Sequence, residues 1–321
     1  MSLMLSLSAL LLILCGNAAL LYRLRRLHTW SQRRAVQLAI LAMPTLLLIL
    51  NLCMLLGTSW HFSPTLLFFA GMTGIAGSAM VLAFLRLLLL IWTMKRHSSV
   101  YSSTLQQKIE QIIQQGQMIV PHVPLVRVVP CQKPLALTYG FRQPTVIISS
   151  WMVSNLEERE LEAVLAHELT HVSRHDALVM WLAEMLRDAF FYMPTSWLAY
   201  RQLQQEKELA CDELAATHTH RPLALAGALA KVWLQTLDSS SGVSSNSLAQ
   251  PLLQAKVAIQ ERIERLLAFS PSEQSPHQEE HSSLLDIMQM LLTIGAMYGS
   301  YCLLMLFAMN CAPSTVLSRF L

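Results

Sequence analysis

Two histidines four residues apart constrain this chain most, because they require a helix and fix which of its faces carries chemistry. His167 and His171 flank Glu168 in the stretch H-E-L-T-H. One helical turn separates the two imidazoles, so both project from the same face and can bind one metal ion. The glutamate is then placed to take a proton from a water on that ion. The pattern is typical of zinc-dependent hydrolysis.

The residues around this motif predict a helix. Ser154 and Glu157 have the spacing of a capping box, which places the start of the helix there. Apolar residues follow at helical spacing, namely Leu161, Leu165, Leu169 and Val172. We therefore expect one side of the helix to be buried in a core, while the two histidines face a cleft.

A zinc site of this kind needs a third protein ligand and leaves a fourth position open. The segment E-K-E-L-A-C-D at residues 206–212 offers one, because Glu208 and Asp212 are one turn apart. We expect Glu208 to be the third ligand and Asp212 to accept the outer N–H of a ligand histidine. Glu206 and Cys211 are the alternative ligands in this segment.

Together these segments resemble the BlaR/MecR-type membrane metallopeptidases, which cleave repressors. The resemblance also includes Y-G-F-R-Q-P-T-V-I-I at 139–148, H-E-L-T-H-V-S-R-H-D at 167–176 and R-I-E-R-L-L at 262–267. Membrane peptidases of the HtpX and Ste type look similar at the two metal motifs. The resemblance implies a gluzincin fold in which His167, His171 and Glu208 bind one Zn²⁺ and Glu168 is the catalytic base.

Composition favours a membrane protein. The chain is 54% hydrophobic and only 13% charged, with a mean hydropathy of +0.43. Four apolar runs, at residues 3–22, 35–56, 66–92 and 284–309, are long enough to cross a bilayer. The predicted fold class is an α-helical membrane protein with an α+β cytoplasmic domain. Four transmembrane helices are expected, with the gluzincin-like metallopeptidase domain inserted between the third and the fourth.

The expected domains follow from these runs: three transmembrane helices in 1–97, the zinc metallopeptidase domain in 98–269, a linker in 270–283, and the fourth transmembrane helix with a short external tail in 284–321. Basic residues crowd the connection after the first run and follow the third, whereas residues 57–64 contain none. The positive-inside rule then predicts a multi-pass protein of the inner cell membrane. Its active site would be cytoplasmic and both of its termini external. The apolar segment 177–193 carries charges on one face and is expected to be a buried or membrane-grazing helix.

Within the metallopeptidase domain, three β-rich runs at 125–129, 135–138 and 145–148 predict a small sheet beside the motif helix. Short polar and amphipathic helices are expected at 104–115 and 252–269. In metallopeptidases of the type that this chain resembles, an exposed edge strand usually holds the substrate as an added strand, and residues 135–139 are the predicted edge.

The predicted function is zinc-dependent endopeptidase cleavage of a cytoplasmic or membrane-proximal protein, as part of regulated, repressor-cleaving proteolysis. Alternatives are an HtpX/Ste-like quality-control protease and a catalytically silent membrane signalling protein. Expected partners are a protein or peptide substrate, the lipid bilayer, and a repressor or a sensory partner. BlaR-type receptors carry an external sensor after the fourth span, whereas this sequence ends near that point, so antibiotic sensing is not expected. The net charge of +3 comes largely from loop arginines and implies no direct nucleic-acid contact.

Overall fold

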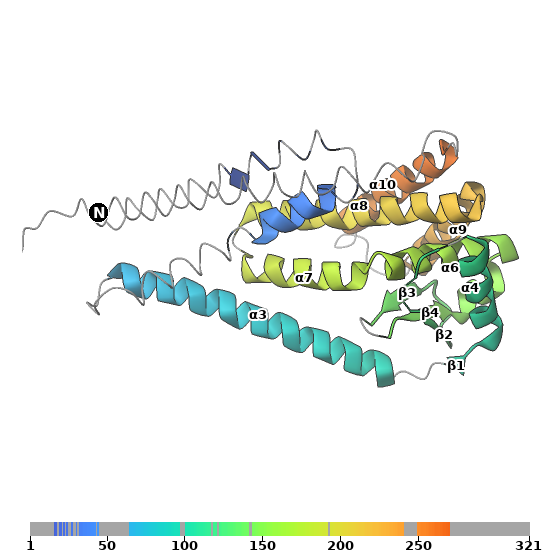
Figure 1. Cartoon of the computed structure of the whole chain (residues 1–321), viewed down its shortest axis with the longest axis horizontal. Coiled ribbons are helices and arrows are strands. Elements are labelled where there is room, and N and C mark those ends of the chain that lie inside the picture. Colours follow the sequence, from blue (N-terminus) through green and yellow to red (C-terminus); the bar gives the residue numbers. More distant parts are fainter. Residues whose placement is uncertain are drawn as a thin grey trace, which may run out of the picture. The chain divides into compact units, whose positions relative to one another are not determined.

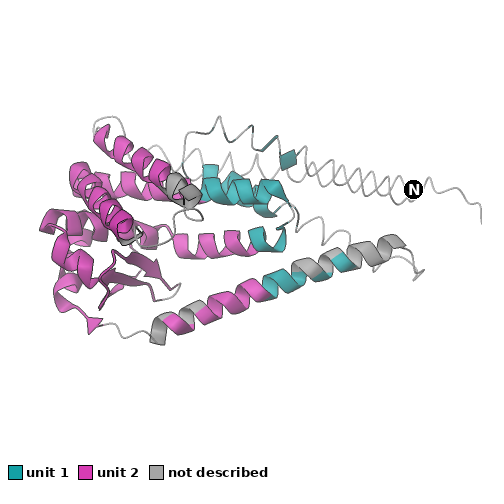
Figure 2. Ribbon diagram, turned by 180° about the vertical axis from the view of Figure 1, so that it is seen from behind, with its two compact units in different colours: residues 1–81, 186–203, 276–321 teal, residues 82–185, 204–275 magenta. Residues whose placement is uncertain are grey.

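A computed structural model describes residues 64–96, 100–116, 118–120, 122–140, 143–191, 193–240 and 249–269, together with part of the stretch from 16 to 44 (Figure 1). The chain divides into two compact units (Figure 2). The first comprises residues 1–81, 186–203 and 276–321, and the second comprises residues 82–185 and 204–275. Every predicted site residue falls in the second unit. The predicted domain boundaries stay predictions.

The described elements are mostly helices with one small sheet. The helices are α3 (Pro64–Arg96), α4 (Ser103–Gln115), α5 (Ser150–Asn155), α6 (Glu158–Ser173), α7 (Asp176–Ala189), α8 (Pro194–Thr219), α9 (Pro222–Ser240) and α10 (Ala249–Leu267). The strands are β1 (Val100–Tyr101), β2 (Leu125–Val129), β3 (Ala136–Tyr139) and β4 (Thr145–Ser149). The structure thus contains strands at all three β-rich runs and helices at both predicted helical segments, with shifts of one to three residues at their ends.

The sheet has the strand order β1-β2-β4-β3. Strand β4 is central and buried along its whole length, as its apolar run Val146–Ile148 predicts. It pairs in parallel with β2 and antiparallel with β3, where Thr138 lies opposite Val146. Strand β3 is therefore an edge of the described sheet, and it lies against helix α6 (Figure 1).

Helix α6 begins at Glu158, three residues after the end of α5. The Glu157 N–H donates a 2.8 Å hydrogen bond to the Glu160 carboxylate, so the capping interaction joins Glu157 and Glu160. The predicted capping box at Ser154 and Glu157 is wrong, because Ser154 lies inside α5 and its hydroxyl donates to Ser150 O. Local spacing alone could not separate the end of one helix from the start of the next.

The core of the second unit forms where α6 meets the sheet and α9. Leu165 and Leu169 of α6 are fully buried together with Val146 and Ile148 of β4. Helix α9 packs closely on α6, because a Cβ atom at Gly227 would lie only 3.0 Å from the Glu160 carboxylate. Lys231 of α9 donates to the same carboxylate at 2.7 Å. Helix α10 then packs on α9, which makes α9 the layer between α6 and α10.

Four transmembrane helices are not found: in the part of the chain that the structure describes, no helix is long and apolar enough to cross a membrane. The run at 66–92 lies within α3, where Arg86 pairs with Glu184 of α7 at 3.7 Å. Arg86, near the end of this apolar run, therefore has a charged protein partner. A span needs a helix that is both of bilayer length and sufficiently apolar. Helix α3 has 33 residues, yet it is not among helices that meet both conditions. The runs at 3–22, 35–56 and 284–309 lie largely or wholly outside the described residues.

Gly140 is essential to the end of the edge strand, because its backbone has a φ of 92°. A Cβ atom there would also lie 2.6 Å from Gln143 O. We predict that Gly140→Ala lowers the free energy of unfolding by about 1–3 kcal/mol, since both strain and a backbone clash are introduced. Thermal unfolding followed by circular dichroism measures this change. Gly74→Ala is the control, because nothing lies within 4 Å of a Cβ atom there and alanine favours a helix. Equal melting temperatures for the two variants would contradict the prediction.

Candidate active site

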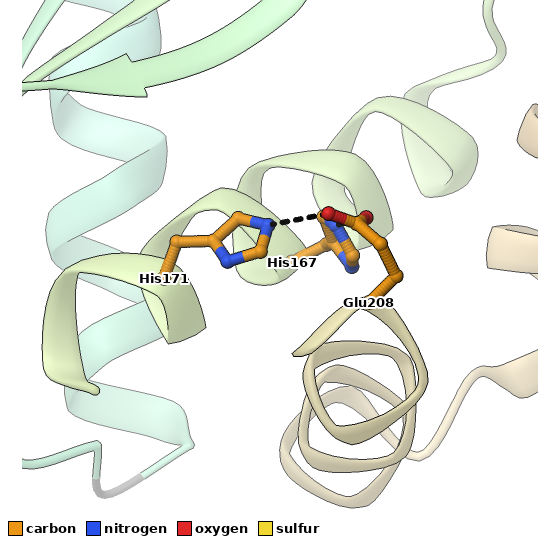
Figure 3. A group of neighbouring side chains, drawn as sticks. All are labelled: His167, His171 and Glu208. Carbon is orange, nitrogen blue, oxygen red and sulfur yellow. Dashed lines mark ion pairs between the residues drawn. The ribbon is translucent and has the colours of Figure 1, made fainter. Parts of the chain in front are cut away.

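Three predicted metal ligands come together from two helices. His167 and His171 project from α6, and Glu208 faces them from α8 (Figure 3). The Nε2 atom of His167 lies 3.5 Å from Glu208 Oε2, and that of His171 lies 3.9 Å from Glu208 Oε1. One ligand atom from each residue falls within 4.8 Å of the others. The one-turn spacing on α6 thus places both imidazoles toward the same carboxylate.

The donor set fits a zinc ion. Nitrogen and oxygen ligands at the usual bond lengths of one tetrahedral zinc lie about 3.3 Å apart, close to the two separations found here. Two imidazoles and one carboxylate are also ligands that zinc accepts, and they leave the fourth position for water. Small side-chain movements would therefore suffice to bring the three groups onto one ion.

The opposite nitrogen of each imidazole lies against its own carboxylate. Asp212 Oδ1 lies 3.0 Å from Nδ1 of His167, and Asp176 Oδ2 lies 2.9 Å from Nδ1 of His171. Such carboxylates fix the orientation of ligand histidines, leaving Nε2 to face the metal. Asp212 is the residue predicted from sequence for this position. Asp176 was missed, although it stands only five residues after His171.

The turn between α6 and α7 explains how Asp176 reaches its histidine. Helix α6 ends at Ser173, and His175 adopts a left-handed conformation with a φ of 55°. The turn separates the two helices and places Asp176, the first residue of α7, beside His171. A sharp turn of this kind has no reliable signature when a histidine occupies the left-handed position.

Cys211, one of the two alternative third ligands, lies on the other side of His171. Its Sγ is 3.1 Å from Nδ1 of His171 and donates to Asp176 Oδ2 at 3.2 Å. Burial raises the pKa of this thiol well above its usual value, and the nearby Asp176 carboxylate raises it further. Cys211 therefore stays a thiol that helps to hold Asp176. His171, Asp176 and Cys211 form a second group of possible metal ligands, in which Cys211 would bind as the thiolate after losing its proton. Glu206, the other alternative, belongs to neither group among the described residues.

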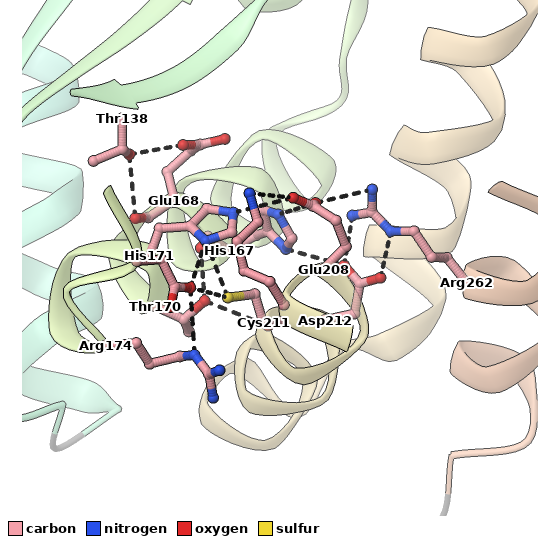
Figure 4. A network of polar contacts seen from close by, with 12 residues as sticks. Thr138, His167, Glu168, Thr170, His171, Arg174, Glu208, Cys211, Asp212 and Arg262 are labelled. Carbon is pink, nitrogen blue, oxygen red and sulfur yellow. Dashed lines mark hydrogen bonds and ion pairs between the residues drawn. The ribbon is translucent and has the colours of Figure 1, made fainter. Parts of the chain in front are cut away.

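Two cations balance the carboxylates of α8, and Figure 4 shows one of them, Arg262, beside Asp212 and Glu208. Arg262 of α10 donates to both oxygens of Asp212, at 2.6 and 2.8 Å, and its Nη1 lies 3.2 Å from Glu208 Oε2. The Lys207 ammonium lies 2.8 Å from Glu208 Oε1. Burial opposes ionisation of both carboxyls, yet their partners hold both pKa values below the ordinary ones. The contacts of Glu208 with His167, Lys207 and Arg262 lower its pKa. The contacts of Asp212 with Arg262 and His167 lower its pKa as well. Neither cation was predicted from sequence.

The charges around His167 also change its own ionisation. Burial lowers the pKa of this imidazole, but the contacts with Asp212 and Glu208 more than compensate and raise it to about 9. Without a metal, His167 therefore carries a proton at neutral pH. Because a metal ion needs the neutral imidazole, binding must displace that proton.

Glu168 lies next to the ligand set and contacts the edge strand. The Thr138 hydroxyl of β3 lies 2.7 Å from Glu168 Oε2 and 3.3 Å from Glu168 O (Figure 4). The glutamate side chain thus points toward the sheet, whereas the histidines of the same helix face α8. Thr138 was not singled out in the sequence, because a threonine in a strand usually serves only packing.

We predict that zinc affinity depends steeply on pH. The pKa of His167 in the folded chain, about 9, lies above the ordinary histidine value of 6.5, so protonation of His167 stabilises the metal-free fold fully below pH 6.5. This stabilisation is lost as the pH rises through the pKa of His167 in the folded chain. Over the same range the proton on His167 stops competing with zinc. Zinc affinity should therefore rise about tenfold per pH unit from about pH 7 to about pH 9 and then level off.

Titration of chelator-treated protein with zinc against a competing indicator measures this slope. The control is Asp212→Asn, which removes a carboxylate that raises the His167 pKa, so its affinity should level off at lower pH. If the zinc affinity of the unaltered chain does not change between about pH 7 and about pH 9, His167 does not carry the proposed proton.

Comparison with known proteins identifies a family and several similar proteins. The sequence model of the family described as BlaR1 peptidase M56 matches residues 62–266. Protease HtpX homolog 1 of Streptomyces coelicolor is 34% identical over 145 residues, which cover 34% of this chain and 47% of the relative. Protease HtpX homolog 2 of Methanosarcina mazei is 30% identical over 143 residues, covering 34% of this chain and 49% of the relative.

Regulatory protein BlaR1 of Bacillus licheniformis is 29% identical over 76 residues, which cover 24% of this chain and 12% of that protein. The match therefore spans about half the length of the two HtpX homologues and a small part of BlaR1. The resemblance inferred from the motifs is confirmed. Because the family match covers more than half of its residues, the chain belongs to the BlaR1 peptidase M56 family.

Proposed function

We propose that this peptidase is a zinc-dependent endopeptidase with its metal bound by His167, His171 and Glu208. The observation that carries the proposal is the convergence of the two Nε2 atoms on one carboxylate, 3.5 and 3.9 Å away. Asp212 and Asp176 would orient the two imidazoles through their Nδ1 atoms, which lie opposite the metal-binding Nε2 atoms. A purely structural zinc site would be closed by a fourth protein ligand, which this group lacks among the described residues.

Zinc at this position would supply Lewis acidity, which lowers the pKa of a bound water and polarises a peptide carbonyl. Glu168 is the proposed general base. Its carboxylate would take the proton from the attacking water and then deliver it to the leaving amine. The hydrogen bond with Thr138 supports this role, because it fixes one carboxylate oxygen and leaves the other free to accept a proton.

Strand β3 is the proposed binding edge for the substrate backbone. It is the terminal strand in the order β1-β2-β4-β3, and it contacts α6 directly. An extended peptide could add to its outer edge through main-chain hydrogen bonds, which accept many side-chain sequences. The contact between Thr138 and Glu168 would place such a peptide beside the proposed base.

The proposed substrate is a protein, and the proposed role is regulated proteolysis with a repressor as target. The name of the relative Regulatory protein BlaR1 supports this role, while the protease HtpX homologues support a quality-control role equally well. We also propose that the enzyme works at a membrane, since the chain is 54% hydrophobic. Large apolar side chains on α3, including Leu82, Leu85 and Leu89, are exposed. The cytoplasmic active site and the external termini stay predictions.

Glu168→Gln tests the proposed base. The amide has nearly the same shape but cannot accept the proton, so we expect proteolysis to fall by at least about a thousandfold while zinc stays bound in equal amount. Parallel measurements are the zinc content and the cleavage of an unfolded protein substrate. Comparing cellular proteins with and without this variant would then identify the physiological substrate. Unchanged cleavage would refute the role, and absence of cleavage in the unaltered, zinc-loaded chain would favour the catalytically silent alternative.

Thr138→Val tests the contact between the edge strand and the base. The variant keeps the side-chain shape and the strand backbone but loses a hydrogen bond to a charged group, which is worth about 1.5–3 kcal/mol. We therefore expect kcat to fall about tenfold or more, with KM nearly unchanged. Thr138→Ser, which retains the hydroxyl, is the matched control and should keep most of the activity. A rise in KM alone would show that Thr138 serves substrate binding instead.

A further inference from the structure

Arg262 contacts two site residues from a helix that contributes no metal ligand. It lies on α10, 50 residues beyond Asp212 in sequence, and its guanidinium group points toward the carboxylates of α8 (Figure 4). The contact with Asp212 is bidentate, with Nε at 2.6 Å from Oδ2 and Nη2 at 2.8 Å from Oδ1. This fork geometry fixes the plane of the carboxylate as well as its position.

The same guanidinium reaches the third ligand. Its Nη1 lies 3.2 Å from Glu208 Oε2, the oxygen that faces His167. Asp212 Oδ1, which Arg262 holds, lies 3.0 Å from the other nitrogen of His167. One side chain is therefore in contact with a proposed ligand and with the residue that orients another. Both carboxylates come from α8, whereas the histidine comes from α6.

The backbone of Arg262 is anchored independently of these contacts. Leu266, one turn further along α10, is 2% exposed and belongs to the core of the unit, and Ile263 packs against that core. Helix α10 packs on α9, and α9 packs on α6. The arginine thus reaches α8 from a support that is attached to the histidine helix. It can fix the position of the two carboxylates relative to the two imidazoles.

We propose that Arg262 is a positioning residue of the metal centre, which holds Asp212 and Glu208 in the orientation that zinc requires. This inference rests on the proposed zinc site. Lysine could not replace it fully, because an ammonium group is a point charge without the planar fork that engages both carboxylates. The position of α10 is then coupled to zinc binding, and by linkage zinc must stabilise α10 in its docked position.

Arg262→Lys is the main test, because it keeps the positive charge and most of the volume. We expect zinc affinity to fall about 10–100-fold, as for other changes to the partners of metal ligands. Cobalt substituted for zinc should show an altered visible absorption spectrum, since its bands depend on ligand geometry. Arg265→Lys is the matched control on the same helix, because Arg265 is half exposed and its ion pair among the described residues is with Glu261, one turn away. It should leave the zinc affinity and the cobalt spectrum unchanged.

Hydrogen exchange provides a second measurement, which distinguishes the proposed coupling of α10 to zinc from a general loss of fold stability. In the unaltered chain, zinc should slow exchange of the α10 amides, and this protection should be smaller in Arg262→Lys than in Arg265→Lys. If Arg262→Lys fails to fold, the pair of substitutions Arg262→Gln and Asp212→Asn removes both charges together. That double variant should fold and still bind zinc more weakly than the unaltered chain.

The outcomes separate this inference from the proposed function. If the unaltered chain binds no zinc, both fail. If it binds zinc and Arg262→Lys binds equally well, with the same cobalt spectrum, only the role of Arg262 is overturned. A double variant with full zinc affinity would overturn it as well, because Arg262 would then serve only to balance charge.

Discussion

The candidate site depends on mutual compensation among charges that are largely removed from water. His167 and Asp212 are both buried, and Arg262 and Glu208 are mostly covered. Each of these groups alone would be costly to bury, since an unpaired charge in an interior loses its hydration without replacement. Here each of these four groups has a partner on a different helix, so all of these contacts form only when α6, α8 and α10 pack together.

The two faces of α6 serve different purposes because of this packing. One side carries Leu165 and Leu169 into the core, while His167 and His171 face the carboxylates of α8. Glu168 points to the edge strand β3 through Thr138. A single helix therefore connects the core, the proposed ligands and the proposed substrate edge. This proximity fits the proposed protease, in which α6 supplies the base and two ligands, α8 the third ligand and β3 the substrate edge.

Much of this could be predicted from the sequence. The one-turn spacings placed His167 with His171 and Glu208 with Asp212, and β-rich runs between prolines placed the strands. The start of α6 was misplaced because Ser154 and Glu157 have a capping spacing although a separate short helix ends between them. The four transmembrane helices were inferred from apolar composition, and the described helices do not provide them. Composition and local spacing do not report which elements a residue meets in the fold.

The sequence by itself determined which residues share a helical face, because helical periodicity is a local property of the chain. It therefore determined the candidate ligands, the candidate base and the family. Only the tertiary structure decided their partners: Asp176 behind His171, Thr138 beside Glu168, and Arg262 across Asp212 and Glu208. Thr138 lies 30 positions from Glu168 in sequence, and Arg262 lies 50 positions from Asp212. The contact of Asp176 with His171 depends on the left-handed turn at His175. Such contacts follow from how the helices and the sheet pack, and packing depends on the whole chain.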